Sequence, residues 1–263
     1  MNLKISNPEN KYYKLAINKE IAIENRHGNE ILDYSNSWSI NPKILKYYNE
    51  DFLNIKDDTE FGWFNYLYEN FSSVDTALSL GGGTGRHEMA LLKAGFVKKW
   101  QSIDLVVDRG ETFHYGGKKV NSLQGDLNFI ELPKNKYPLI FCRGFLHHIV
   151  NLEHLIWQVN KALTNDGLFI VTEYIGEKKW QFSDRKRKFI KQKLKNKYND
   201  IYPGNILQFR SISEMNRQRP TEAIRSNEIL PSLHSTFNGN IVKEYIGSYF
   251  IYPTINLLHK DFK

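Results

Sequence analysis

The sequence Ala-Leu-Ser-Leu-Gly-Gly-Gly-Thr-Gly-Arg-His-Glu at residues 77–88 constrains the fold more than any other part of the chain. An apolar run ends at three glycines, a fourth glycine follows one residue later, and a helix-like stretch begins at once. Such a strand–turn–helix unit brings backbone N–H groups against a ligand, and glycine lets the backbone approach closely or adopt a positive φ. We therefore interpret Gly81, Gly82, Gly83 and Gly85 as a ligand-binding loop.

A carboxylate follows this loop at the spacing of nucleotide-binding βαβ units. Asp104 ends the next apolar run, 19 residues after Gly85, near the position at which an acid meets ribose hydroxyls. The glycine pattern is G-x-G-x-G, whereas nicotinamide and flavin cofactors are typically bound by G-x-G-x-x-G. Together with Asp104, the loop resembles motif I of the class I S-adenosyl-L-methionine (SAM) methyltransferases.

Composition limits the classes of protein to consider. A chain of 263 residues fits one large domain, or a core domain with a cap. No apolar stretch is long enough to cross a bilayer, and the N-terminus lacks the apolar segment of a signal peptide. The single cysteine, Cys142, excludes an internal disulfide, so a cytoplasmic location is expected, and its apolar strand pattern favours a packing role over a nucleophilic one. The net charge of +7 favours an anionic partner, which is a phosphorylated small molecule, nucleic acid or a membrane surface.

Strand and helix patterns alternate along the middle of the chain, which predicts an α/β fold with a mostly parallel, Rossmann-like sheet and helices on both faces. We divide the chain into an N-terminal helical cap at 1–73, a core at 74–176, and a segment at 177–263 that contains a basic helix, a substrate-side insertion and the last strand. Strands are expected at 77–80, 100–105, 120–123, 139–142, 168–172 and 241–250. Helices are expected at 11–24, 61–71, 88–94 and 152–163, with a turn at 165–167.

Further segments resemble the class I methyltransferase series in order. Gly125-Asp126-Leu127-Asn128 is similar to the motif whose carboxylate takes the adenine amino group. Residues 137–149 and 165–171 are similar to the motifs along the fourth and fifth strands. The resemblance implies SAM as cofactor and S-adenosyl-L-homocysteine as product. It implies cofactor contacts from Ser79, Gly81, Gly82, Gly83, Gly85, Asp104, Leu105, Asp126, Leu127 and Arg143.

A narrower resemblance covers residues outside this series. The segments 78–81, 173–176, 180–184 and 222–226 are similar to bacterial methyltransferases of capsule and surface-polysaccharide biosynthesis. This similarity implies O-methylation of a sugar hydroxyl on a nucleotide-linked or phosphorylated precursor. A related option is methylation of a phosphate-derived decoration, such as a phosphoramidate. We expect substrate contacts from Tyr174, Trp180, Gln181 and Arg225, although Arg225 is equally typical of a structural ion pair and Trp180 of core packing.

Methyl transfer to a hydroxyl needs a group that accepts its proton. His147 and His148 follow the fourth strand and Glu173 ends the fifth, so these three residues are the candidate catalytic groups, with cofactor packing as the alternative for the histidines. No His/Cys cluster has zinc spacing, so no metal site is expected, although a few carboxylates that bind Mg²⁺ would leave no pattern.

Two other functions stay open at this point. The basic stretch at 178–197, with ten Lys or Arg and one acid, is typical of a solvated face but also suits an anionic lipid surface or RNA. Against RNA, strand four is followed by Cys-Arg-Gly-Phe-Leu-His-His, without the Asn/Asp-Pro-Pro-aromatic tetrad of base-amine methyltransferases. A non-catalytic SAM-binding subunit is favoured by Ser79, which stands where the family usually has an acid.

Overall fold

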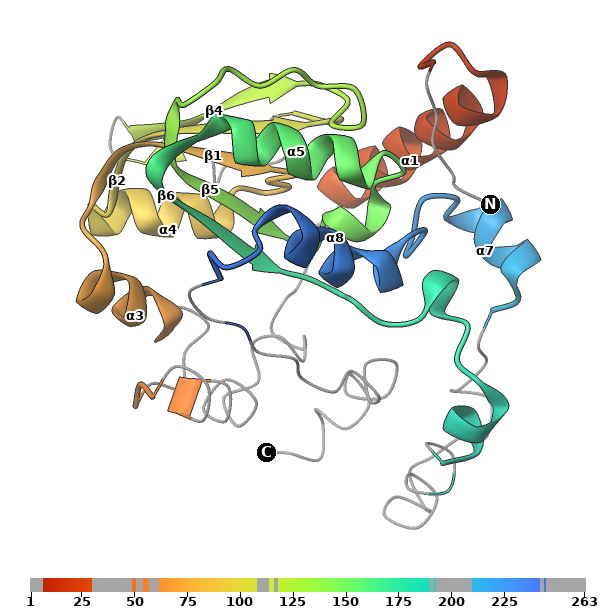
Figure 1. The fold of residues 1–263 in the computed structure, drawn as a ribbon. Helices are drawn as coiled ribbons and strands as arrows, with labels where there is room; N and C mark the ends of the chain where they lie inside the picture. The colour runs from red at the N-terminus through yellow and green to blue at the C-terminus, as the bar shows by residue number, and fades with distance from the viewer. Residues whose placement is uncertain are drawn as a thin grey trace.

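A computed structural model describes residues 7–29, 49–50, 54–56, 62–107, 114–115, 118–189, 192, 210–241 and 244. Its centre is a six-stranded sheet of order β3-β4-β2-β1-β5-β6 (Figure 1). The strands are β1 (Val74–Leu80), β2 (Val97–Asp104), β3 (His114–Tyr115), β4 (Lys118–Gln124), β5 (Tyr137–Arg143) and β6 (Leu163–Thr172). All neighbouring strands pair in parallel except β3, which is antiparallel to β4. This topology confirms the predicted Rossmann-like sheet.

Helices cover both faces of the sheet, as the sequence predicts. The helices α5 (Leu152–Ala162) and α8 (Ile229–Thr236) pack on one face, in a core that includes Leu78 and Ile140. On the other face, α3 (Gly62–Asn70) and α4 (Arg86–Ala94) pack with Trp100. Helix α3, which we expected in the N-terminal cap, therefore packs against the sheet together with α4. Successive strand residues point to opposite faces, so an apolar parallel strand supplies both cores.

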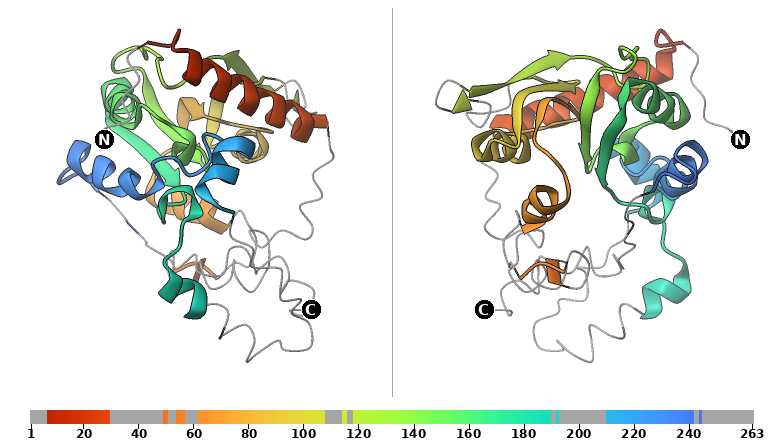
Figure 2. Two further views of the ribbon diagram at one scale, coloured as in Figure 1. Left: turned by 90° about the vertical axis from the view of Figure 1, so that its right-hand side faces the viewer. Right: turned by 60° about the vertical axis from the view of Figure 1, so that its left-hand side comes forward.

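Helix α1 (Lys11–Asn29) lies beside the sheet rather than in either helical layer (Figures 1 and 2). The hydroxyl of Tyr13 donates to Oδ2 of Asp126 at 2.6 Å, just after β4. Further along α1, Oε2 of Glu20 accepts a hydrogen bond from Oγ1 of Thr221 at 2.7 Å. Helix α1 therefore joins the carboxyl end of the sheet to the segment that follows α7 (Ile212–Gln218).

One expectation about the later elements differs from the structure, and two others lie largely outside the described residues. The predicted turn at 165–167 is an irregularity inside β6, because Tyr137 pairs with Leu163 and Leu139 with Leu168. The extra residues bulge out of the strand and fold back, so that a methyl group on Gly167 would lie 3.0 Å from the backbone of Thr164. The strand expected at 241–250, apart from residues 241 and 244, lies outside the described residues, as does the basic stretch from 190 to 197 except residue 192.

Among the described residues, no helix combines the length and the apolar character that a membrane span requires. The smaller helical turns are η5 (Leu146–His148), η6 (Lys178–Trp180) and η7 (Ser226–Glu228). Of these, η5 follows β5 directly and carries both candidate histidines, so their positions are set by the end of a central strand.

Candidate functional site

A pocket of about 270 Å³ lies at the carboxyl ends of the central strands. Gly81 follows β1, Asp104 ends β2, Asp126 follows β4 and Arg143 ends β5. In open α/β sheets, ligands bind in the crevice outside these strand ends. The predicted cofactor residues that line the pocket are Gly81, Gly82, Gly83, Asp104, Leu105, Asp126, Leu127 and Arg143. Ser79 and Gly85 belong to the same strand–loop–helix unit, behind that lining.

The glycine loop has the geometry that the sequence predicts. Gly81, Gly83 and Gly85 have φ values of 66°, 56° and 66°, in the left-handed region that glycine favours. A methyl group on Gly81 would lie 2.1 Å from Cδ2 of Phe145, whereas one on Gly83 would meet no described atom within 4 Å. The backbone of the loop thus approaches the ring of Phe145 at Gly81 and borders open space at Gly83. This arrangement fits a loop against which a ligand is held.

Two buried or half-buried carboxylates stand at successive strand ends along the pocket. Oδ2 of Asp104 accepts a hydrogen bond from the Gly83 N–H at 3.1 Å, which ties the carboxylate to the glycine loop. Oδ1 of Asp126 accepts from the Asn128 N–H at 3.0 Å, while Oδ2 accepts from Tyr13. Burial and the Asp126 carboxylate raise the pKa of Tyr13 above its usual value, so this hydroxyl stays a donor. Both carboxylates therefore line the pocket, and their predicted contacts with the ribose and the adenine of the cofactor stay predictions.

An acid occupies the neighbourhood of Ser79 after all, but it comes from helix α4. Oγ of Ser79 donates to Oε1 of Glu88 at 2.7 Å and accepts from Nε1 of Trp100 at 2.9 Å. Glu88 is 3% exposed and lines the pocket, and burial raises the pKa of its carboxyl while Ser79 opposes that change. Sequence reasoning missed Glu88 because it considered the strand position alone, although the residue is three positions past Gly85 in the first helical turn.

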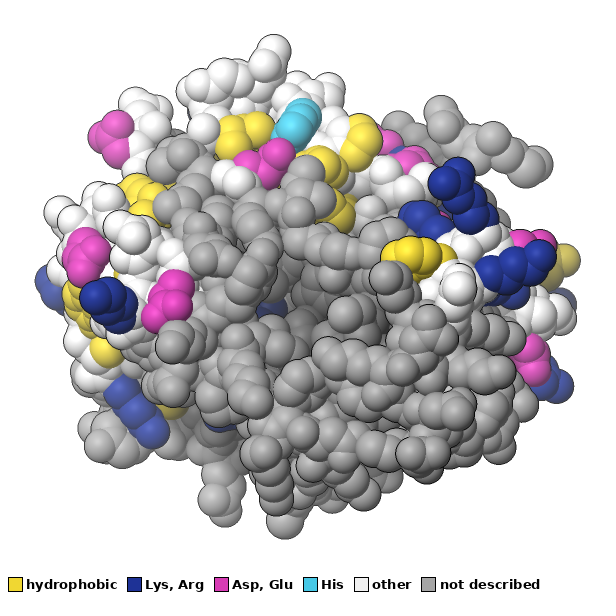
Figure 3. Space-filling model, turned by 90° about the horizontal axis from the view of Figure 1, so that it is seen from below, with side chains coloured by type: hydrophobic (Ala, Val, Ile, Leu, Met, Phe, Trp, Pro, Cys, Tyr) yellow, Lys and Arg dark blue, Asp and Glu magenta, His cyan; other side chains and the backbone are white. Residues whose placement is uncertain are grey.

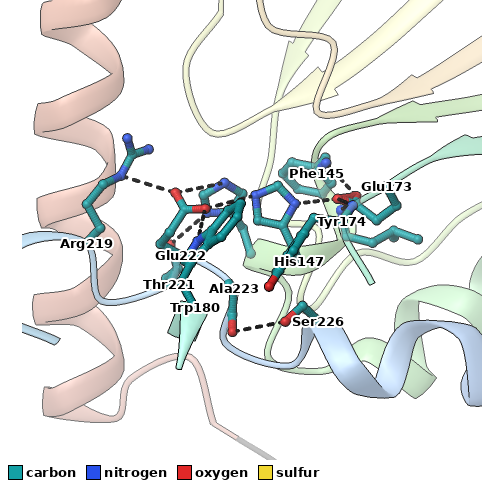
Figure 4. A network of polar contacts seen from close by, with 12 residues as sticks. Phe145, His147, Glu173, Tyr174, Trp180, Arg219, Thr221, Glu222, Ala223 and Ser226 are labelled. Carbon is teal, nitrogen blue, oxygen red and sulfur yellow. Dashed lines mark hydrogen bonds and ion pairs between the residues drawn. The ribbon is translucent and has the colours of Figure 1, made fainter. Parts of the chain in front are cut away.

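The first candidate histidine lies between two carboxylates. Nδ1 of His147 contacts Oε1 of Glu173, and its Nε2 lies 3.4 Å from Oε1 of Glu222 (Figure 4). Oε2 of Glu173 also accepts from the backbone N–H groups of Phe145 at 2.8 Å and Leu146 at 2.7 Å. Burial opposes a charged imidazole, but Glu173 and then Glu222 outweigh it and raise the pKa of His147 to about 10. Glu173 therefore acts here as an anchor for η5 and for the ring of His147.

The second candidate histidine reaches the pocket itself. His148 lines the pocket, and its Nδ1 lies 3.2 Å from Oγ1 of Thr221, whose own proton goes to Glu20. Burial, together with the positive charge of His147, lowers the pKa of His148 to about 3. The pKa values of the two adjacent imidazoles are thus shifted in opposite directions, upward for His147 and downward for His148.

Glu222 completes this cluster, and sequence reasoning gave it no role. Its Oε2 lies 3.4 Å from Nε of Arg219 and 4.0 Å from Nε2 of His148. The segment is held in place because the Ile224 N–H donates to the carbonyl of His147 at 2.9 Å. Burial raises the pKa of Glu222, but His147, His148 and Arg219 together lower it well below its usual value. No local pattern marks Glu222, because its two histidine partners lie about 75 residues away in the chain.

The predicted substrate residues gather behind the cluster, apart from the pocket lining. The rings of Tyr174 and Trp180 stack with centroids 4.0 Å apart, and Nε1 of Trp180 donates to Oε1 of Glu222 at 3.3 Å. Nε2 of Gln181 donates to the carbonyl of Arg210 at 2.9 Å. The stacked pair therefore supports Glu222, and Gln181 joins two chain segments. Their role in substrate binding stays a prediction.

Arg225 forms structural ion pairs, which is one of the two roles that the sequence left open for it. Its guanidinium is paired with Glu153 at 2.7 Å and with Glu228 at 3.1 Å, and Nη1 also donates to the Val150 carbonyl at 2.9 Å. These hydrogen bonds outweigh burial and raise its pKa further. Arg225 is 5% exposed and is not part of the pocket lining, so it joins η7 to helix α5.

Two further predictions concern the anionic partner suggested by the net charge and the packing role of Cys142. On the face shown in Figure 3, the described Lys and Arg side chains are interspersed with Asp and Glu. Cys142 is fully buried, and burial raises the pKa of its thiol, which fits a packing role.

Comparison with known proteins assigns the central segment. Residues 78–171 match the methyltransferase domain family, and this match confirms the predicted cofactor, SAM. The matched segment runs from β1 to β6 and contains every predicted cofactor residue. The central part of the chain is therefore similar to the methyltransferase domain family.

Solved structures with a similar arrangement include several methyltransferases. A SAM-dependent methyltransferase from Mesorhizobium loti is 20% identical, with 43% of this chain and 56% of that chain covered and a TM-score of 0.37. A methyltransferase described as putative, from Bacillus halodurans, is 20% identical, with coverages of 49% and 56% and a TM-score of 0.38. Phosphoethanolamine N-methyltransferase 2 from Haemonchus contortus is 15% identical, with coverages of 57% and 33% and a TM-score of 0.35. The chain spans less than two thirds of the length of each, and a search of curated proteins found no match.

Proposed function

We propose that this protein is a SAM-dependent O-methyltransferase. The observation that carries this proposal is the pocket at the strand ends, where the glycine loop, Asp104 and Asp126 of the methyltransferase domain come together. SAM supplies an electrophilic methyl group on a sulfonium centre. The protein has to hold the cofactor and an acceptor in line for this transfer.

The residues of the pocket divide between the parts of the cofactor. Asp104 would accept hydrogen bonds from the ribose hydroxyls, and Asp126 from the adenine amino group. Glu88 would accept a hydrogen bond from the amino group of the methionine part. It would thereby take over the contact of the family's usual acid, whose position Ser79 occupies in this chain. Arg143 lines the same pocket and carries the charge that a carboxylate requires.

The acceptor oxygen is proposed to lose its proton to His148, the member of the His147, His148 and Glu222 cluster that lines the pocket. His148 lines the pocket, and the three side chains are buried to 18% exposure or less. Glu173 is a positioning residue in this proposal, since its oxygens are taken up by η5 and His147. A general acid–base group must lie within reach of the proton it accepts, and His148 meets this requirement because it lines the pocket.

The acceptor is proposed to be a sugar hydroxyl on a nucleotide-linked or phosphorylated precursor of a capsular or surface polysaccharide. The resemblance of residues 173–176, 180–184 and 222–226 to such enzymes supports this class. The carboxylates of Glu20 and Glu24 line the pocket near His148, and carboxylates are good acceptors for sugar hydroxyls. The net charge of +7 supports an anionic precursor.

Methyl transfer from SAM to a panel of acceptors tests this proposal. The panel contains nucleotide sugars, sugar phosphates, a phosphoramidate and a bulk RNA, and the readout is release of S-adenosyl-L-homocysteine. We expect turnover with one of the sugar compounds and loss of it in Asp104→Ala. Turnover with RNA alone would identify an RNA methyltransferase, and SAM binding without turnover on any acceptor would identify a binding subunit; either result contradicts the proposal.

A further inference from the structure

Two imidazoles and one carboxylate converge beside the pocket. One ligand atom from each of His147, His148 and Glu222 lies within 4.8 Å of the other two. Nε2 of His147 is 3.4 Å from Oε1 of Glu222, and Nε2 of His148 is 4.0 Å from Oε2 of the same carboxylate. Figure 4 shows Glu222 facing His147 on the side away from Glu173. Both Nε2 atoms thus point toward one carboxylate group.

The remaining ring nitrogens are already engaged. Nδ1 of His147 contacts Glu173, which is itself fixed by backbone N–H groups of η5. Nδ1 of His148 is held by Thr221, whose hydroxyl is fixed by Glu20. Histidines that bind metals almost always engage the second nitrogen in this way, which sets the tautomer and the ring orientation. The arrangement leaves each Nε2 as the atom for ligation.

Glu222 is held as firmly as the rings. Its carboxylate accepts from Nε1 of Trp180 at 3.3 Å and faces Nε of Arg219 at 3.4 Å, with a side chain that is 14% exposed. Four carboxylates, of Glu20, Glu173, Glu222 and Glu24, contact Arg219 or one of the two histidines. Buried and partly buried acids in such number are usually balanced by cations or by a metal ion.

We propose that His147, His148 and Glu222 bind a divalent transition-metal ion of the Zn²⁺ type. Two imidazole nitrogens and one carboxylate are a common ligand set for Zn²⁺ at sites that keep open positions, whereas Mg²⁺ and Ca²⁺ prefer oxygen. The ion takes the place of the proton between His147 and Glu222, because metal ligands are deprotonated on binding. The proposal of a metal site depends only on the geometry of this cluster, and not on the proposed function.

The use of this ion rests on the proposed function. His148 lines the pocket, so an ion bound to its Nε2 would stand next to the acceptor. A divalent ion lowers the pKa of a bound hydroxyl and orients it, which would prepare the acceptor oxygen for attack on the methyl group. With the ion bound, Nε2 of His148 is a ligand and no longer accepts the proton. The proton of that hydroxyl then leaves to solvent or to a neighbouring carboxylate, and no electron transfer is involved.

Metal titration of the full, untagged and metal-free chain tests the site. We expect one Zn²⁺ per chain by calorimetry, visible ligand-field bands when Co²⁺ is added instead, and no comparable binding of Mg²⁺. His148→Gln and Glu222→Gln should each weaken Zn²⁺ binding at least about 100-fold, and Glu173→Gln about 10- to 100-fold through the orientation of His147. The matched control is His234→Gln, which removes an imidazole on α8 that contacts Glu244 and is 47% exposed.

The same samples are titrated with SAM, so that the two proposals fail separately. Absence of stoichiometric Zn²⁺ binding in a wild-type chain that binds SAM would overturn the metal site and leave the methyltransferase proposal intact. Equal Zn²⁺ affinity in wild type, Glu222→Gln and Glu173→Gln would also overturn it. Loss of Zn²⁺ affinity in these variants, with SAM affinity retained, supports the site and shows that the variants are folded.

Discussion

Alanine substitutions at Gly81 and Gly83 should destabilise the protein to different extents. Both residues have a positive φ, of 66° and 56°, so alanine at either position pays about 1–2 kcal/mol for the left-handed backbone. At Gly81 the added methyl group also lies 2.1 Å and 2.3 Å from two ring atoms of Phe145. Displacing a packed ring adds about 1–3 kcal/mol. At Gly83 no described atom lies within 4 Å of the added group.

The expected losses in the free energy of unfolding are therefore about 1–2 kcal/mol for Gly83→Ala and about 2–5 kcal/mol for Gly81→Ala. Urea unfolding, followed by circular dichroism and by tryptophan fluorescence, measures both values on the same scale. Gly83→Ala serves as the control for backbone strain, because it shares the positive φ and lacks the steric contact. Equal losses for the two variants would refute the packing of the loop against Phe145.

Three further predictions follow from the site. Glu88→Gln should weaken SAM binding about 10- to 100-fold in calorimetry, since a hydrogen bond to a charged group contributes about 1.5–3 kcal/mol. In the metal-free chain, stability should fall by a few kcal/mol, in order of magnitude, as the pH rises from 6.5 through about 10, because the folded pKa of His147 lies above its unfolded value. Urea unfolding of metal-free protein across this range measures the slope, and Glu173→Gln should flatten it. Tyr13→Phe should cost about 1.5–3 kcal/mol of unfolding free energy, because it removes the hydrogen bond to Asp126.

Each of these predictions has a matched control. Glu131→Gln changes an exposed carboxylate outside the pocket lining and should leave SAM affinity unchanged; an equal loss in both Glu variants would speak against a role of Glu88. Tyr12→Phe alters a neighbour on α1 that is 81% exposed, and equal unfolding free energies for the two Tyr variants would contradict the Tyr13 account. A pH slope that persists unchanged in Glu173→Gln would show that another group titrates.

The cofactor side of the site was predictable because its signals are local. The glycine loop and Asp104 belong to one strand–turn–helix–strand unit, so their spacing alone places them at the same sheet edge. Alternation of strand and helix patterns likewise predicted the parallel sheet. Element bounds were less accurate, as the bulge within β6 shows, because apolar patterning does not report a register shift.

The acceptor side was predictable only in part, because its contacts join distant segments. The hydrogen bond between Thr221 and Glu20 spans 201 positions, and no local pattern reports such a pair. Residue type also failed to separate two roles of Arg225, since a guanidinium binds a ligand phosphate and a protein carboxylate with the same geometry. The structure resolves that choice through Glu153 and Glu228. The sequence marked His147 and His148, whose catalytic role stays a prediction, but it did not mark Glu222, which lies beside both.

Calorimetric titration of the purified protein with SAM, S-adenosyl-L-homocysteine and NAD tests the central claim most directly. The account predicts micromolar binding of both adenosyl-sulfur ligands, no comparable binding of NAD, and a clear loss of affinity in Asp104→Ala. Unchanged SAM affinity in that variant, or the absence of SAM binding by the intact protein, would contradict the assignment of the pocket at the strand ends.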